Sequence, residues 1–163
     1  MDYRIRHVEQ KDLDQVTAVE AVCFPEAEAA GKEDFRQRIE AFPESFFVAE
    51  EKDGNIIGFI NGAVTGHRTI CDEMFEDVRF HDRNGAYQSV FGLDVVPERQ
   101  GQGVASALME HLIETARVQG RKGVILTCKE RLIPFYQKFG YQNLGVSQSV
   151  HGGAVWYDMI LEF

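Results

Sequence analysis

The sequence feature that most limits the possible folds is a glycine-rich turn at residues 100–103, Gln-Gly-Gln-Gly. An apolar segment at 87–96 precedes it, and residues 104–116 follow it with apolar side chains spaced for one helical face. At such a turn, backbone N–H groups point toward one place and the helix dipole adds partial positive charge. The segment therefore predicts a strand–turn–helix unit with a place for phosphate.

Three explanations of this turn compete. A nucleotide-binding P-loop ends in Gly-Lys-Ser/Thr, whereas Gly103 is followed by Val-Ala-Ser. A dinucleotide-binding fold has its glycines early in the chain and an acidic residue about 20 positions later, where this chain has Arg121 and Lys122. A plain strand-to-helix turn is the third explanation, and it is the commonest meaning of an isolated short glycine motif.

The remaining pattern predicts one mixed α/β domain without repeats or linkers. Alternating or wholly apolar segments indicate strands, and spacings of three and four residues indicate helices. The predicted strands are 3–8, 45–51, 55–65, 87–96, 123–128, 141–146 and 154–161. The predicted helices are 11–23, 33–42, a helix from 104 that ends at Gly120, and 130–139 with Gly140 as its cap. Residues 66–86 predict a loop with at most a short helix.

Composition excludes several classes of protein. The 163 residues carry a net charge of −9, which argues against a general nucleic-acid binder. The charge is uneven, because residues 99–138 hold seven basic and three acidic side chains. No apolar run approaches the roughly 20 residues that a membrane helix needs, and the first residues contain no signal-peptide stretch. We therefore expect a cytoplasmic protein without a membrane partner.

The cysteines and histidines do not indicate a metal site. Cys23, Cys71 and Cys128 are odd in number and far apart, which argues against a disulfide framework and fits a reduced compartment. The five histidines also lack ligand spacing. We expect no metal.

Residues 93–109, LDVVPERQGQGVASALM, resemble the acetyl-CoA-binding motif of the GCN5-related N-acetyltransferase (GNAT) superfamily. That motif reads Gln/Arg-x-x-Gly-x-Gly/Ala, here Gln100, Gly103 and Ala105, and it follows a strand ending in Val-x-Pro-Glu. A second family block, Phe-Tyr-x-x-x-Gly-Phe/Tyr, matches residues 135–141. Two motifs in the family's order are far more specific than either alone.

Within this superfamily the chain is most similar to the arylalkylamine (serotonin) N-acetyltransferase group and its bacterial relatives. The similarity rests on segments 44–50, 59–62 and 132–141 and on the Phe24-Pro25 break. The resemblance implies a single α/β (α+β) domain over residues 1–163. Its mixed, mostly antiparallel twisted sheet would have six to seven strands and about four flanking helices, with an acetyl-CoA-binding core at 87–141.

The resemblance also implies acetyl-CoA as co-substrate. The N–H groups of the glycine-rich turn would hold the pyrophosphate, the strand before it would pair with the pantetheine arm, and the N–H of Val95 would polarise the acetyl carbonyl. The implied cofactor-binding residues are Leu93, Asp94, Val95, Gln100, Gly101, Gln102, Gly103, Val104, Ala105 and Ser106.

Tyr136 matches the family tyrosine that protonates the departing thiolate, and a phenol with a pKa near 10 stays protonated at neutral pH. The base is not identified. Where the animal enzymes have two histidines, this chain has Ser89 and Phe91. Glu26, Glu50 and His151 are candidates by chemistry alone, and each is also a plausible surface group.

Phe24 and Trp156 match the aromatic cage that holds the acceptor amine in the family, although core packing explains Trp156 almost equally well. The sequence therefore predicts an N-acetyltransferase that transfers acetyl directly to a small primary amine. A peptide or protein N-acetyltransferase and a non-catalytic coenzyme A sensor are the alternatives. Because the superfamily is often dimeric, a homodimer stays open.

Overall fold

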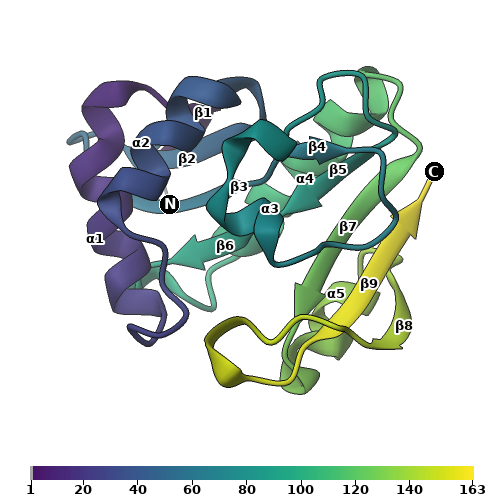
Figure 1. The fold of residues 1–163 in the computed structure, drawn as a ribbon. Helices are drawn as coiled ribbons and strands as arrows, with labels where there is room; N and C mark the ends of the chain where they lie inside the picture. The colour runs from purple at the N-terminus through teal and green to yellow at the C-terminus, as the bar shows by residue number, and fades with distance from the viewer. Residues whose placement is uncertain (1) are drawn as a thin grey trace. The chain divides into compact units, whose positions relative to one another are not determined.

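The structure is a computed structural model that describes residues 2–163 (Figure 1). Over this range the chain forms nine strands, five α-helices and several short 3-10 turns. It divides into two compact units. Unit 1 runs to Gly62 and includes Gly92–Leu112, whereas unit 2 comprises Ala63–Phe91 and Ile113–Phe163.

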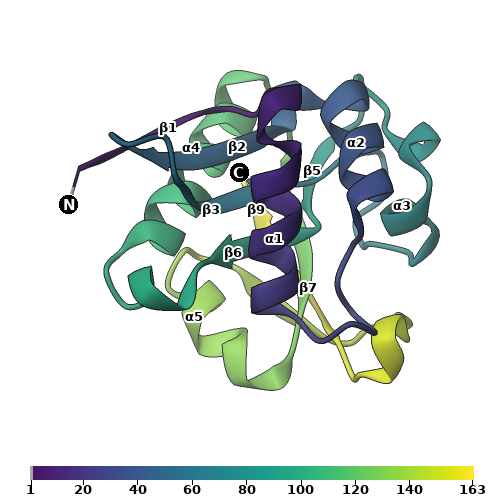
Figure 2. The same ribbon diagram turned by 90° about the vertical axis from the view of Figure 1, so that its left-hand side faces the viewer.

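Unit 1 contains an antiparallel sheet of four strands in the order β1-β2-β3-β6. Two neighbouring helices lie against one face of this sheet, with their apolar stripes turned toward it (Figure 2). A third helix, α4, begins in this unit. The bounds are β1 Tyr3–His7, β2 Phe46–Glu51, β3 Ile56–Asn61, β6 Gly92–Val95, α1 Leu13–Cys23, α2 Lys32–Ala41 and α4 Val104–Val118.

Aromatic packing joins α2 to the sheet of unit 1. The ring of Phe35 from α2 meets Phe46 of β2 and Phe59 of β3 at centroid distances of 6.2 and 5.5 Å. All three side chains are fully buried. Burial of each ring contributes about 1.5–3 kcal/mol, which makes this cluster a main support of the unit.

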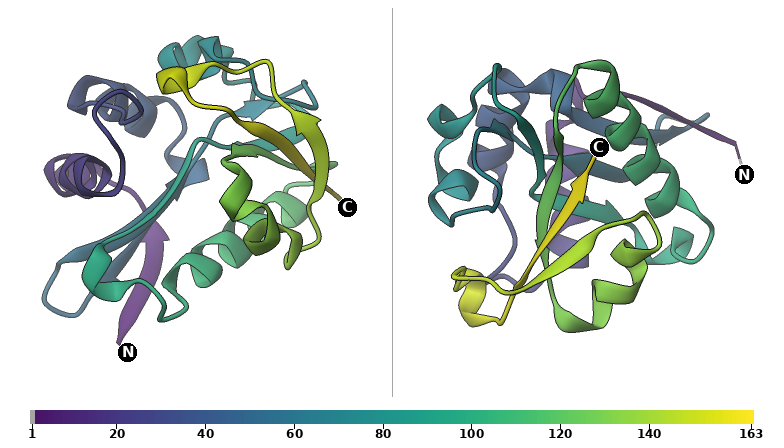
Figure 3. Two further views of the ribbon diagram at one scale, coloured as in Figure 1. Left: turned by 90° about the horizontal axis from the view of Figure 1, so that it is seen from below. Right: turned by 90° about the vertical axis from the view of Figure 1, so that its right-hand side faces the viewer.

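Unit 2 contains a five-stranded sheet in the order β4-β5-β7-β9-β8, with β5 and β7 parallel and the other pairs antiparallel (Figure 3). Buried Ile125 and Ile160 at its centre pack with Met74 and Tyr87. The bounds are β4 Val64–Thr65, α3 Glu73–Glu76, β5 Tyr87–Val90, β7 Gly123–Cys128, α5 Ile133–Gln137, β8 Gln142–Val146 and β9 Tyr157–Glu162.

The structure confirms the predicted α/β class but has nine strands in two sheets. Two segments that were each predicted as one strand form two strands, one in each sheet. Segment 55–65 divides into β3 and β4 around Gly62-Ala63, and segment 87–96 divides into β5 and β6 at Phe91. The apolar pattern continues through both breaks because the residues on each side are buried or partly buried, so the pattern does not show the change of partner strand.

Two further boundaries differ from the sequence prediction. The predicted helix 130–139 consists of a 3-10 turn, Glu130–Leu132, followed by the short helix α5. Pro134 fits the first turn of α5, where its missing N–H is not needed. The last strand begins at Tyr157 instead of at residue 154. Segment 66–86 contains one short helix, α3, and a 3-10 turn, as the pattern allowed.

An arginine-centred ion-pair group fastens the start of the chain to the sheet of unit 1. Arg6 donates to both carboxylate oxygens of Asp12, at 2.8 and 2.9 Å, and to Oε2 of Glu50 at 2.9 Å. Burial raises the pKa of Asp12, but hydrogen bonds from Arg6 and from the backbone of Glu9 lower it more. The hydrogen bond from Arg6 lowers the pKa of Glu50 to about 2.

We expect Arg6→Met to lower the free energy of unfolding by about 2 kcal/mol at pH 7, between the values typical of exposed and buried pairs. Both carboxyl pKa values are lowered in the folded state, so this stabilisation is present above about pH 4–5 and is lost as the pH falls further. Denaturant unfolding at pH 7 and pH 3 should therefore show a smaller difference between variant and wild type at pH 3. Arg4→Met is the matched control, because Arg4 is 72% exposed and pairs with Glu50 only at the surface. Equal losses in both variants at pH 7 would contradict this account.

Candidate active site

The glycine-rich turn lies between a 3-10 turn, Pro97–Arg99, and the start of α4. Gly101 and Gly103 have φ of +75° and +87°, a backbone conformation that favours glycine. A Cβ at either position would meet no atom within 4 Å. The glycines are therefore needed for the left-handed backbone conformation, and no neighbouring atoms cover the outer side of the turn.

Side chains of the same segment hold the turn in place. The amide of Gln100 donates to the carbonyl oxygen of Val95 at 3.0 Å, and that of Gln102 donates to the carbonyl oxygen of Glu98 at 3.3 Å. Both glutamines thus fasten the turn back onto the chain that precedes it. This explains the role of Gln100 in the motif.

The start of α4 presents backbone N–H groups that the helix does not use. The N–H of Ala107 donates to the carbonyl oxygen of Gly103 at 3.0 Å. The N–H groups of Val104, Ala105 and Ser106 precede this bond, so they have no acceptor within the helix. Together with the dipole of a 15-residue helix, they suit an anion such as a diphosphate.

Strand β6 is the last strand of its sheet and turns alternate peptide groups away from β3. The N–H of Val96 donates to the carbonyl oxygen of Ile57 at 2.9 Å. Hydrogen-bonded pairs alternate along an antiparallel ladder, so the next such pair is Asp94 and Phe59. The peptide groups of Leu93 and Val95 therefore point away from β3. An extended ligand arm has the peptide groups of Leu93 and the N–H of Val95 available for pairing, whereas the carbonyl oxygen of Val95 already accepts from Gln100 and from the thiol of Cys23.

Asp94 is placed differently from its two neighbours. Its peptide group faces Phe59 inside the sheet, and its side chain is buried beneath α1 and α2 together with Glu20 and Arg38. Of the three β6 residues expected at the cofactor, only Leu93 and Val95 offer outward backbone groups.

Tyr136 lies on α5 in unit 2 and is 8% exposed. Its ring meets those of Phe135 and Tyr141 edge-on, at centroid distances of 5.1 and 5.8 Å. These contacts hold the phenol ring in one orientation. Phe24, at the end of α1, and the cofactor positions belong to unit 1, whereas Tyr136 and Trp156 belong to unit 2.

An aromatic cluster gathers beside one end of the sheet in unit 2. β5 and β7 run parallel and β9 pairs antiparallel with β7, so Phe91, Lys129 and Trp156 adjoin the same ends of their strands. Neighbouring rings of the cluster are in contact, with centroid distances of 5.0 Å for Phe91–Phe75, 5.1 Å for Phe75–His151 and 6.1 Å for His151–Trp156. The ammonium group of Lys129 lies 5.6 Å from the centre of the Trp156 ring.

Hydrogen bonds hold the loop that carries part of this cluster. Asp72 accepts from the hydroxyl of Ser149 and from the N–H of Val150, and the indole N–H of Trp156 donates to the carbonyl oxygen of His151 at 2.8 Å. Part of the acidic segment 72–82 thus has a structural role, which the composition did not indicate.

The structure gives no base at the two positions that the sequence resemblance matches to family histidines. Ser89 is fully buried and donates its hydroxyl to the carbonyl oxygen of Ala63 at 2.6 Å, and Phe91 packs on Phe75. Glu26 is exposed. Burial raises the pKa of Cys128 to about 11, so it is a neutral strand thiol at pH 7, as expected.

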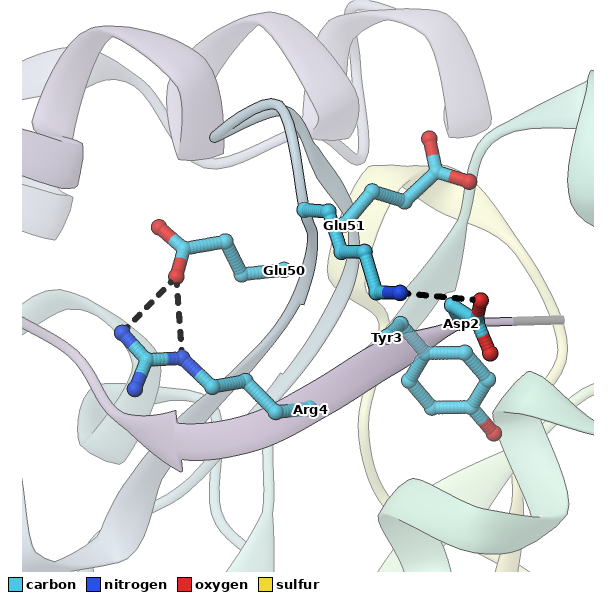
Figure 4. A pocket seen from close by; sticks show the side chains of 6 residues that line it. Asp2, Tyr3, Arg4, Glu50 and Glu51 are labelled. Carbon is cyan, nitrogen blue, oxygen red and sulfur yellow. Dashed lines mark hydrogen bonds and ion pairs between the residues drawn. The ribbon is translucent and has the colours of Figure 1, made fainter.

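Glu50 belongs to a surface pocket on β1 and β2 that contains two ion pairs between its own lining residues (Figure 4). Nη2 of Arg4 lies 3.1 Å from Oε1 of Glu50, and Nζ of Lys52 lies 3.3 Å from Oδ2 of Asp2. Glu51, which also lines the pocket, pairs instead with Arg99. With a pKa of about 2, Glu50 stays ionised at neutral pH and is a weak base. The pocket is lined by Asp2, Tyr3, Arg4, Glu50, Glu51 and Lys52.

Sequence reasoning missed a buried polar cluster in unit 1, formed by Glu20, Arg38, Asn61 and Asp94. Arg38 donates to the side-chain oxygen of Asn61 at 3.2 Å, and Glu20 accepts from the N–H of Ala30 at 2.9 Å. A signal was present, because Glu20 and Arg38 occupy positions on the apolar stripes of their helices.

No helix in residues 2–163 is both long enough and apolar enough to cross a bilayer. Among the same residues, no group of three or more histidine, cysteine, aspartate or glutamate side chains is arranged to hold a metal ion.

The fold and site define a class: a mixed α/β protein with an open strand edge and, at a helix start, a turn whose N–H groups suit an anion. The acetyltransferase (GNAT) family model matches residues 13–141, so the chain belongs to this family. The match confirms the superfamily and the acetyltransferase class that the two motifs indicate. It does not reach the narrower arylalkylamine group.

Two curated proteins are similar in sequence. The probable hydrolase YhcX of Bacillus subtilis is 28% identical over 142 residues, and the alignment covers 83% of this chain and 27% of that protein. An uncharacterized N-acetyltransferase of Archaeoglobus fulgidus is 26% identical over 121 residues, covering 72% of this chain and 76% of the other. The chain thus spans about a quarter of the Bacillus protein.

Solved structures share the fold over nearly the whole chain. The loading GNATL domain of CurA from Lyngbya majuscula has a TM-score of 0.85 at 18% identity, with 99% of this chain and 98% of that chain covered. The GphF GNAT-like decarboxylase in complex with isobutyryl-CoA has a TM-score of 0.82 at 22% identity, with 98% of each chain covered. Arabidopsis thaliana Naa50, in complex with the bisubstrate analogue CoA-Ac-MVNAL, has a TM-score of 0.75 at 20% identity, with 100% of both chains covered.

Proposed function

We propose that the chain acts as one catalytic domain, residues 1–163, that transfers acetyl from acetyl-CoA directly to the primary amine of a small molecule. The observation that carries this proposal is the continuous unit of edge strand β6, left-handed turn and α4 start. Its open peptide groups suit a ligand with an extended arm and a diphosphate, which is the chemistry of coenzyme A.

The residues of unit 1 have distinct tasks in this proposal. The N–H groups of residues 101–106 bind the pyrophosphate, and the outward peptide groups of Leu93 pair with the pantetheine arm. The N–H of Val95 donates to the acetyl oxygen and stabilises the charge that develops there. Bound acetyl-CoA supplies an activated thioester carbonyl. Tyr136 donates a proton to the departing thiolate.

The acceptor is best described as an amine that carries an aromatic ring. The cluster of Phe75, Phe91, His151 and Trp156 in unit 2 offers flat apolar faces to an aryl group. This supports the arylalkylamine-like substrate that the sequence resemblance implies. For Phe24, a role at the amine is what the sequence resemblance implies. The fold shared with Naa50, crystallised with a peptide-containing analogue, keeps a peptide N-terminus as the second candidate.

The test is release of free thiol from acetyl-CoA with a panel of arylalkylamines, polyamines and short peptides, alongside calorimetric binding of acetyl-CoA. Turnover with an arylalkylamine supports the proposal, whereas turnover with peptides alone favours the second candidate. Binding without any turnover indicates a coenzyme A sensor. Absence of binding contradicts the central proposal. The cytoplasmic location and the homodimer remain predictions of the sequence.

Replacing Trp156 with alanine should raise KM for an arylalkylamine by about tenfold, because removal of one aromatic contact surface costs about 1–2 kcal/mol. KM for acetyl-CoA should stay the same. Trp156→Phe is the matched control, since it keeps a ring but removes the N–H that donates to His151. An unchanged amine KM in both variants would place Trp156 outside the acceptor site.

A further inference from the structure

The most unusual group in unit 1 is the carboxyl of Asp94. The side chain is 1% exposed, and neither oxygen accepts from an N–H or hydroxyl group of the described residues; the carboxyl of Glu20 is the neighbour within hydrogen-bonding reach. An ionised carboxylate without donors is among the most unfavourable groups to bury. A fold keeps such a group only if a proton, a ligand or a function accounts for it.

The surroundings of Asp94 explain how the group is tolerated. Glu20 and Cys23 from α1 and Arg38 from α2 are the titratable groups that face it, and β3 contributes the amide of Asn61. Two carboxyls and one guanidinium carry a net charge of −1 when all are ionised. The ionised pair can therefore take up one proton, which makes the cluster neutral and supplies the missing donor.

Gly92 is the point where this cluster meets the backbone of β6. A Cβ at Gly92 would lie 3.2 Å from an oxygen of Asp94, 3.6 Å from the amide nitrogen of Asn61 and 3.8 Å from an oxygen of Glu20. Three polar side chains therefore converge on the one position of β6 that lacks a side chain. Gly92 itself is partly exposed, whereas Asp94 is not.

We propose that the Asp94–Glu20 carboxyl pair accepts the proton that the acceptor amine must lose before it attacks the thioester. The inference rests on the proposed function. It supplies the base that is missing at Ser89 and Phe91, one residue from the Val95 N–H that is assigned to the acetyl oxygen.

The proton balance is complete within the chain and its substrates. The ammonium gives its proton to the ionised carboxylate of Asp94, and the nitrogen lone pair forms the new bond to the acetyl carbon. The carbon–sulfur bond then breaks, and the thiolate takes a proton from Tyr136. Between turnovers Asp94 releases its proton to solvent and Tyr136 regains one from solvent, so no further reactant is needed.

The pair also suits this task by its acidity. Burial raises the pKa of Asp94 well above its ordinary range, and the charge of Glu20 raises it further, whereas Arg38 lowers it. A base works best when its pKa lies near the working pH. Because only the ionised form accepts a proton, kcat/KM should rise with pH through the pKa of Asp94 and fall on acidification.

Three proteins test the inference: wild type, Asp94→Asn and Glu20→Gln. With an amine that the wild type turns over, D94N should lower kcat about 100-fold or more, with little change in the Kd for acetyl-CoA. E20Q removes the like charge, so it should move the acid limb of the pH–rate profile down by about one pH unit or more. A purely structural pair would alter thermal stability and leave this limb in place.

Carboxyl ¹³C NMR gives a readout that needs no turnover. The Asp94 resonance, identified by its loss in D94N or by its shift in E20Q if D94N does not fold, should titrate well above the ordinary range of an aspartate in the wild type. Titration of Asp94 in the ordinary range of an aspartate, or an unmoved acid limb in E20Q, would overturn the inference, while wild-type turnover would leave the proposed function intact. A wild type that turns over no amine contradicts the proposed function and this inference together.

Discussion

Replacing Tyr136 with phenylalanine is expected to lower kcat by about 10²–10⁴-fold, the range typical of a lost general acid. The change removes one hydroxyl and keeps the ring, so the edge-on contacts with Phe135 and Tyr141 persist. The Kd for acetyl-CoA should therefore stay within about twofold of the wild-type value. Steady-state kinetics and calorimetry on the same preparations check both parts.

The matched control is Tyr141→Phe, the same chemical change one ring away. Tyr141 is also buried, and burial raises its pKa well above the ordinary value, so it keeps its proton. We expect this variant to change stability more than turnover. If Y136F turns over as fast as the wild type, Tyr136 has no part in the chemistry.

Replacing Gly103 with valine is expected to weaken acetyl-CoA binding by about 100-fold or more. The φ of +87° at Gly103 is unfavourable for a β-branched residue, so the turn will change its backbone or the new side chain will cover the N–H groups. Charge-assisted hydrogen bonds contribute about 1.5–3 kcal/mol each, and the loss of two accounts for the expected change. Calorimetric titration with acetyl-CoA measures it directly.

Gly54→Val separates backbone strain from ligand binding. Gly54 lies in the hairpin between β2 and β3 and has φ of +91°, and, as at Gly103, an added Cβ would meet no atom within 4 Å. Each substitution should cost about 1–3 kcal/mol of stability. Only the variant at Gly103 should lose acetyl-CoA affinity. Normal affinity in G103V would refute the anion-binding role of the turn.

The acceptor site was less predictable than the cofactor site. Trp156 was matched to the family's aromatic cage and Phe91 to a family histidine, but their connection through Phe75 and His151 depends on segments that are about 60 to 80 residues apart in the chain. Loop residues carry no regular period, so the sequence does not show which loops meet. The arylalkylamine assignment therefore remains a proposal.

The amino-acid sequence by itself determined the features that depend on near neighbours. Gly101 and Gly103 allow a left-handed turn whatever surrounds them, and the apolar stripe of 104–116 makes a helix after it. The order of the two motifs was sufficient to indicate the superfamily that the family match confirms. These features are local because backbone conformation and helical periodicity act over a few residues.

The tertiary structure alone decided which strand pairs with which and what surrounds Asp94. Alternation of apolar and polar residues indicates that a strand has a buried face, but not which strand it pairs with. The changes of sheet at 62–63 and 91–92 could therefore not be predicted from the sequence. From the sequence, Asp94 was expected to contact the cofactor, like Leu93 and Val95. Glu20 and Arg38 are 74 and 56 positions away from Asp94 in the sequence, and only the folded chain brings them together. Burial and the neighbouring charges then set the pKa of the Asp94 carboxyl, which is why the sequence alone did not predict it.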